Sequence, residues 1–181
     1  MRGMLRAMRS FVRKLVPRIL LDQYRRFRRS WEERQNVSKS VEEVFTTVYE
    51  KNKWGGQKGE FSSGTGSTDE QIVSAYISTV SKKASHENFR ELTFVDLGCG
   101  DFRVGKQLLP LCAYYIGVDI VKPLINYNQQ RYGNQRTHFQ YLDIVRDRLP
   151  VGDVCFVRQV LQHLSNRLLK NSPNASHDAR S

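Results

Sequence analysis

The chain has 181 residues, 39% of them hydrophobic, which suits one domain with a core and an appendage. No apolar run reaches the roughly eighteen residues of a membrane-spanning helix, and basic residues interrupt the first apolar stretch, so we expect no signal peptide. The net charge of +11 is uneven, because residues 1–35 carry +8 and the remainder +3. This asymmetry predicts an attached basic element and argues against a nucleic-acid-binding catalytic surface.

The first segment, residues 1–37, is predicted to be a basic amphipathic arm. Its apolar residues recur at spacings of three and four, which is typical of one helix face, although Pro17 would kink or restart the helix. Such a helix can lie on an anionic membrane surface through residues 1–35, which would make a cytoplasmic protein peripheral at the inner membrane face. A solvated arm and a helix docked on a partner are the alternatives.

Residues 38–91 are predicted to form a helical segment with a Gly/Ser loop. A first helix begins at Ser38 or Ser40 and ends near Asn52. After the loop, Ser67 or Thr68 caps a second helix. Its predicted core-facing positions are Ile72, Val73, Tyr76, Ile77 and Val80. The loop between the helices is either a plain linker or a cover over a binding site.

Residues 92–169 alternate between strand and helix patterns, which predicts right-handed βαβ units and a Rossmann-like parallel sheet of the α/β class. Its central feature is Phe94-Val-Asp-Leu-Gly-Cys-Gly-Asp-Phe102, a strand that runs into a turn at Gly98 and Gly100. Glycines there allow backbone angles closed to other residues and a close approach by a ligand.

Acidic residues stand at the ends of the next two predicted strands, Asp119 near the end of Tyr115–Ile120 and Asp143 directly after Thr137–Leu142. Ligands bind at the carboxyl edge of open α/β sheets, and an acidic side chain there can accept both hydroxyls of a ribose. In the dinucleotide fingerprint a third glycine would stand where this chain has Arg103, so NAD is disfavoured.

The pattern Asp96-x-Gly98-x-Gly100 resembles the first motif of class I S-adenosylmethionine (SAM) methyltransferases. The resemblance implies that the glycine turn lies against the methionine part of SAM and that Asp96 lies near its ammonium group. It implies further that Asp119 holds the ribose and that Asp143 meets the adenine amino group. Phe102 stands where many members have a third glycine.

From about Val41 to Ser165 the chain also resembles bacterial methyltransferase-domain proteins often found with glycan and surface-polysaccharide genes. Tyr49-x4-Trp54-Gly-Gly, the Ser-Gly-x-Gly-Ser run and His163-Leu-Ser carry this likeness. It implies a lid over the open end of the SAM pocket and O-methyl transfer to a sugar, glycan or small-molecule hydroxyl. His163 is the candidate catalytic base; the alternatives are a structural histidine and transfer without a dedicated base.

Three function classes stay open: a SAM-dependent methyltransferase, a SAM-binding protein without turnover, and a disfavoured NAD-type oxidoreductase. A methyltransferase sheet of the resembled kind has seven strands, so we expect a domain cut short after Ser165 or Asn166, with a short helix to about Leu169 and a disordered tail over 170–181. A genuinely compact variant of the domain is the alternative. An uncovered strand at 153–157 would then favour self-association and weaken activity.

Three cysteines, Cys99, Cys112 and Cys155, are an odd number without metal-ligand spacing. They are predicted to be reduced thiols of a cytoplasmic protein, and no metal site is expected. Packing is the expected role of Cys99, inside the turn, and of Cys155, inside the last strand.

Overall fold

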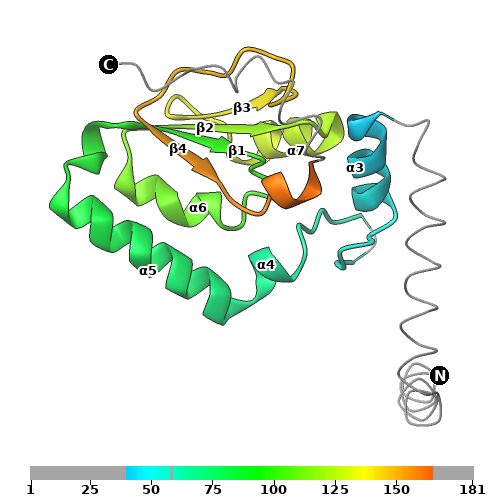
Figure 1. Cartoon of the computed structure of the whole chain (residues 1–181), viewed down its shortest axis with the longest axis horizontal. Coiled ribbons are helices and arrows are strands. Elements are labelled where there is room, and N and C mark those ends of the chain that lie inside the picture. Colours follow the sequence, from blue (N-terminus) through cyan, green and yellow to red (C-terminus); the bar gives the residue numbers. More distant parts are fainter. Residues whose placement is uncertain (1–39, 58, 165–181) are drawn as a thin grey trace, which may run out of the picture. The chain divides into compact units, whose positions relative to one another are not determined.

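The computed structural model describes residues 40–57 and 59–164. The predicted arm over 1–37, the helix end near Leu169 and the tail over 170–181 therefore lie outside the described residues. The described residues from Val41 to Leu164 belong to one compact unit. Its larger elements are α3 (Val41–Glu50), α4 (Thr65–Thr68), α5 (Glu70–His86), β1 (Thr93–Leu97), α6 (Gly105–Leu108), β2 (Tyr114–Asp119), α7 (Lys122–Tyr132), β3 (Thr137–Tyr141) and β4 (Val154–Val157) (Figure 1). Short 3₁₀ helices cover Phe89–Glu91, Leu109–Leu111 and Leu161–His163.

The four strands form one parallel sheet in the order β3-β2-β1-β4. The chain therefore builds outward from β1 to β3 and then returns to the other side of β1. This reversal makes a topological switch point between β1 and β4, where ligands of open α/β sheets bind. The Rossmann-like parallel sheet predicted from the sequence is confirmed over these strands.

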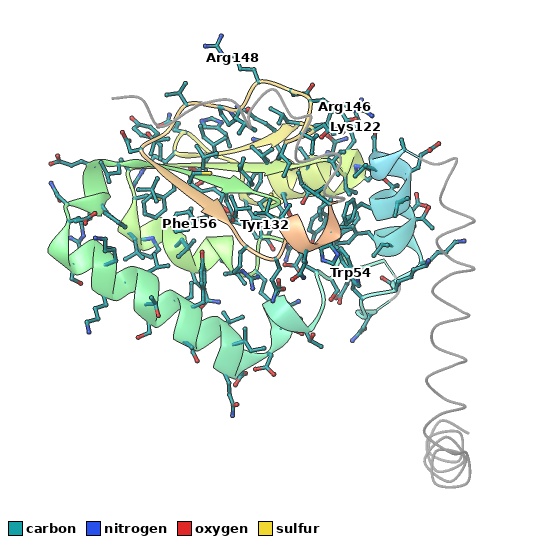
Figure 2. The ribbon with its side chains drawn as sticks, viewed as in Figure 1. Trp54, Lys122, Tyr132, Arg146, Arg148 and Phe156 are labelled. Atoms are coloured by element: carbon teal, nitrogen blue, oxygen red, sulfur yellow. The ribbon has the colours of Figure 1, made fainter. Side chains whose placement is uncertain are left out.

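One face of the sheet carries most of the core. Phe94, Tyr115 and Phe139 point to this face, where they pack with residues of α5, α6 and α7. Figure 1 shows α5 and α6 on the same side of the sheet, and Figure 2 shows Phe156 of β4 on that side. Burial of these aromatic side chains, with Phe94 and Phe156 rings 4.9 Å apart, fixes β4 against β1.

The opposite face is covered differently. Val95, Leu97 and Val118 are buried there under a loop that contains Leu142, Ile144 and Leu149. Cys155 of β4 points to this face and is exposed, which corrects the expectation that it packs in the core. No element among residues 40–57 and 59–164 covers it, whereas Cys99 and Cys112 are buried as free thiols.

The second helix also differs in detail from its prediction. Its cap is Asp69, whose Oδ1 accepts hydrogen bonds from the backbone N–H groups of Gln71 (3.0 Å) and Ile72 (3.1 Å). Ser67 and Thr68 belong instead to the separate turn α4, which ends at the extended residue Asp69. Ile72 is 48% exposed, so the core-facing stripe begins with Val73 and continues through residues that pack partly on the core.

Candidate functional site

A cavity of about 250 Å³ lies at the carboxyl ends of β1, β2 and β4. One wall comes from the sheet and its following loops, and the other from α3 and the segment up to Ser67. All six site residues predicted from the sequence line this cavity: Asp96, Gly98, Gly100, Asp119, Asp143 and His163. The structure therefore brings together side chains that the sequence separates by up to 67 positions, while their roles toward a ligand stay predictions.

The glycine turn has the conformation expected from its sequence. Gly98 and Gly100 have φ angles of 79° and 55°, in the left-handed region that favours glycine. The N–H groups of Gly98 and Cys99 both donate to the carbonyl of Val118, at 2.7 and 2.9 Å, which ties the turn to β2. A Cβ on Gly98 would lie 2.3 Å from Cγ2 of Val160. The turn thus needs glycine both for its angle and for space.

Phe102 stands where the resembled motif often has a third glycine, and its φ of 61° is unusual for a side chain of this size. The ring is only 1% exposed. It lies 5.2, 5.1 and 4.8 Å from the rings of Tyr115, Tyr132 and Phe139. Aromatic packing therefore offsets the backbone strain, and the turn keeps its left-handed residue without a glycine.

Asp119 connects the end of β2 to the glycine turn. Its Oδ2 accepts from the N–H of Gly100 and its Oδ1 from the N–H of Val121, each at 3.1 Å. Burial raises the pKa of the carboxyl to about 6, although these N–H groups act to lower it. Each carboxylate oxygen can accept a second hydrogen bond, so the side chain can still receive hydroxyl groups from a ligand.

Asp96 is buried beside the turn, and its Oδ2 accepts a hydrogen bond from the hydroxyl of Tyr115. Burial raises the pKa of Asp96 to about 6, while the Tyr115 bond and the charge of Arg158 lower it. The carboxylate is thus ionised at neutral pH in a poorly solvated position. Such a group gains most from a cationic ligand.

Asp143 follows β3 and is less enclosed than the other two carboxylates. Its Oδ1 accepts from the N–H of Val145 at 2.9 Å, and its Oδ2 lies 3.7 Å from Nε of Arg146. The side chain is 20% exposed. The backbone bond holds the carboxylate at the cavity wall, next to the apolar side chains of Leu142 and Ile144.

His163 ends the 3₁₀ helix after β4, and its ring meets two aromatic rings of the opposite wall. The ring centroids of Phe45 and Trp54 lie 5.9 and 5.5 Å from that of His163. Figure 2 shows Trp54 beside this orange helix. Partial burial lowers the pKa of His163, so the imidazole is neutral at pH 7 and can accept a proton.

The covering segment, which we define as residues 59–68, contacts the tip of the glycine turn. The N–H of Ser63 donates to Oδ2 of Asp101 at 2.9 Å, and the N–H of Asp101 donates to Oγ of Ser63 at 2.8 Å. The hydroxyls of Tyr49 and Ser63 are also hydrogen-bonded, at 3.0 Å. This interlock holds the segment against the turn, with its Ser63–Ser67 stretch along the cavity wall.

Sequence reasoning missed the two residues that follow β4. Arg158 donates through Nη1 to the carbonyl of Gly66 (2.7 Å) and through Nη2 to Oγ of Ser67 (2.8 Å). Gln159, at a φ of 57°, packs so closely on Gly66 that a Cβ there would meet its Oε1 at 1.8 Å. A charged residue directly after an apolar strand pattern at the carboxyl edge was the available signal for Arg158.

Burial also decides the chemistry of the thiol inside the turn. Desolvation, followed by the charges of Asp119 and Asp96, raises the pKa of Cys99 well above its ordinary value. The thiol is therefore protonated at neutral pH and is not a nucleophile. Packing, as expected from the sequence, is the role that its burial fits.

Residues 95–172 match a protein family described as a methyltransferase domain. The matched stretch contains the glycine turn, all three carboxylates and His163. The match supports the expected methyltransferase class, with SAM as its cofactor, for this part of the chain. A comparison with curated proteins gave no match.

Several solved structures are similar to the chain over part of their length. Human N-acetylserotonin methyltransferase in complex with SAM is 21% identical, with 73% of this chain and 36% of that protein covered and a TM-score of 0.44. The magnesium protoporphyrin IX methyltransferase of Synechocystis PCC 6803 is 25% identical, with 41% and 35% covered and a TM-score of 0.34. A dimethyladenosine transferase of Plasmodium falciparum is 25% identical, with 36% and 25% covered and a TM-score of 0.32.

The chain thus spans a quarter to about a third of the length of these three solved proteins. Among the described residues, no helix combines the length and the apolar character needed to cross a membrane.

Proposed function

We propose that this chain binds SAM in the cavity at the switch point and transfers its methyl group to an acceptor hydroxyl. One observation carries the proposal: a left-handed glycine turn and three carboxylates from successive strands line the same cavity. These residues all belong to the stretch that matches a methyltransferase domain. Asp96 would pair with the ammonium group, Asp119 would hold the ribose hydroxyls and Asp143 would meet the adenine amino group.

The charges of this cavity favour a cationic ligand. SAM carries a sulfonium and an ammonium group, whereas NAD carries a pyrophosphate. Asp96 and Asp119 are both buried at the wall, and a phosphate group beside them would meet unfavourable repulsion. Isothermal titration with SAM, S-adenosylhomocysteine (SAH) and NAD tests this point directly; tight binding of NAD alone would contradict the proposal.

The sulfonium of SAM supplies an activated methyl group, so the protein has mainly to align the acceptor oxygen with the methyl carbon. The oxygen–carbon bond forms as the carbon–sulfur bond breaks, and the hydroxyl proton has to leave. His163, neutral at pH 7, is the proposed acceptor of that proton. Its contacts with Phe45 and Trp54 also suit a structural histidine, in which case solvent would take the proton.

The acceptor is proposed to be a hydroxyl of a sugar, a glycan or another small molecule. The sequence resemblance to glycan-associated methyltransferase-domain proteins supports this class. So does the aromatic wall of Phe45, Trp54 and His163, because flat rings pack against the apolar faces of cyclic ligands. Release of SAH in the presence of candidate sugars is the test, and SAH binding without any release would favour a SAM-binding protein.

Two expectations concern surfaces that the cavity does not explain. Residues 1–35, outside the described part, are proposed to bind anionic vesicles in a salt-sensitive way. A chain starting at Ser38 that still co-sediments with such vesicles would contradict this.

Strand β4 pairs only with β1 among the described strands, and we propose that its other edge supports self-association. A strictly monomeric species at high concentration in size-exclusion chromatography would argue against that proposal.

A further inference from the structure

Arg158 is a cation at the cavity wall, and the function proposed above gives it no ligand group to bind. It follows β4 directly and lies two residues after Phe156, the residue that pairs with Asp96 of β1. Side chains two positions apart in a strand point to the same face. Phe156 shares its face with Phe94, as their ring contact shows, and this is also the face of Asp96. Arg158 and Asp96 therefore approach the cavity from neighbouring strands on one side of the sheet.

The contacts of the Arg158 guanidinium leave room for an anion. Its two hydrogen bonds to Gly66 and Ser67 use one N–H of each terminal nitrogen, out of the five that an arginine carries. The ring of Tyr76 lies 5.5 Å away on one side. Among the described residues no carboxylate forms an ion pair with Arg158. The charge of Arg158 does act on Asp96, whose pKa it lowers, but the two groups form no direct ion pair. A half-buried guanidinium with unused donors can therefore still receive a carboxylate.

Asp96 and Arg158 thus offer one negative and one positive group in the cavity that Gly98 also lines. The amino-acid end of SAM has the complementary pattern, an ammonium and a carboxylate on one carbon atom. We infer that Arg158 binds the carboxylate of this group while Asp96 binds its ammonium, so that the chain selects a complete α-amino acid end on the cofactor. This inference rests on the proposed function.

The test compares ligands that differ only in the amino-acid end. SAH carries both charged groups, decarboxylated SAH keeps the amine without the carboxylate, and 5′-methylthioadenosine lacks both. We expect the parent chain to bind SAH about 10–100-fold more tightly than decarboxylated SAH, the range of a hydrogen-bonded charged contact. In Arg158→Gln this ratio should fall to nearly one, mainly because SAH binds more weakly.

Two variants separate carboxylate binding from the structural contacts of the same side chain. Ser67→Ala removes the partner of Nη2 but keeps the guanidinium, so the ratio should persist. Arg131→Gln removes an exposed arginine that does not line the cavity and should leave the ratio unchanged. Arg158→Lys keeps the charge and should retain part of the preference.

The outcomes distinguish the inference from the proposal beneath it. If the parent chain binds none of the three adenosyl ligands, the proposed function itself fails. If it binds SAH no better than decarboxylated SAH, the inference is overturned without any variant. Equal weakening of all three ligands in Arg158→Gln would make Arg158 a structural anchor of the covering segment, which also overturns the inference.

Discussion

The two walls of the cavity are held in place by different kinds of interaction. On the sheet wall, the glycine turn is tied by backbone hydrogen bonds to Val118 and its angles are set by Gly98 and Gly100. On the opposite wall, most of the hydrogen bonds involve side chains. The chief ones join Ser63 to Asp101, and Arg158 to Gly66 and Ser67. The first wall depends on strand register and the second on a few side chains.

This difference bears on which wall can move. Shifting the glycine turn would break parallel-sheet pairing and expose buried aromatic residues such as Phe102. Releasing the covering segment costs a few side-chain hydrogen bonds, each contributing about 0.5–1.5 kcal/mol, and the packing of Phe61 against the rings of Tyr49 and Tyr127. We therefore expect the covering segment, and not the sheet wall, to move when a ligand enters, and we expect changes to the sheet wall to have the larger effects on binding.

The largest effect is expected for Gly98→Val. A β-branched residue at a φ of 79° is strained, and its Cβ would lie 2.3 Å from the side chain of Val160. We expect SAH affinity to fall on the order of 100-fold or more, as measured by titration calorimetry. Gly59→Ala is the matched control, because Gly59 has a φ of 89° but nothing within 4 Å of its Cβ position. A folded Gly98→Val chain with parental affinity would refute the assignment of the turn.

Asp119→Ala should have the next largest effect. It removes the proposed ribose acceptor and leaves the N–H groups of Gly100 and Val121 without their carboxylate. A loss of about 1–3 kcal/mol in SAH binding is expected. Asp119→Asn retains one oxygen acceptor and should fall between parent and Ala. Equal affinities for the three folded chains, in the same titration, would show that this carboxylate does not touch the ligand.

The pH dependence of binding should follow the two buried carboxylates. The pKa values of Asp96 and Asp119 are both raised to about 6, so below pH 6 they become neutral and lose their attraction for a cationic ligand. SAH affinity should fall by up to about tenfold per pH unit for each group that has to be ionised. Calorimetry at pH 7.5, 6 and 5 measures this, and an affinity that stays constant across the series would contradict it.

Stability should show the opposite trend in the ligand-free chain. Because burial raises these two pKa values above those of the unfolded chain, the folded state binds more protons between about pH 4 and 6. The contribution of both groups to stability is therefore fully present below about pH 4 and is lost as the pH rises through 6. Asp96→Asn removes one of the two titrating groups. Its urea midpoint should therefore fall less between about pH 4 and pH 6 than the urea midpoint of the parent chain.

The smallest effect is expected for Ser63→Ala, on the side-chain-held wall. It removes the hydroxyl that accepts from Asp101 and bonds to Tyr49, but keeps the Ser63 N–H bond. Amide exchange in residues 59–68 should speed up by about tenfold, while SAH affinity changes less than in Asp119→Ala. Ser74→Ala, which removes an exposed hydroxyl bond within α5, is the control. Unchanged exchange in Ser63→Ala would show that the interlock does not hold the segment.

The sequence by itself determined the sheet wall. The strands around Asp96 and Asp119, the glycine turn between them and the parallel sheet follow from local patterns, because alternation, turn glycines and strand-end acids act over a few residues. Periodicity was less reliable at a surface helix, where it assigned Ile72 to the core although 48% of that residue is exposed. It also could not show that Cys155 lies on the part of its sheet face that the loop with Leu142, Ile144 and Leu149 leaves exposed.

Only the tertiary structure decided the second wall and the partners of the buried charges. Tyr115 and Asp96 are 19 positions apart, Ser63 and Asp101 are 38, and Arg158 and Gly66 are 92. Hydrogen bonds over such separations form because the order β3-β2-β1-β4 brings the strand ends and the covering segment to one edge. No local pattern encodes that meeting, since each residue alone is an ordinary loop or strand residue whose role depends on what the sheet places beside it.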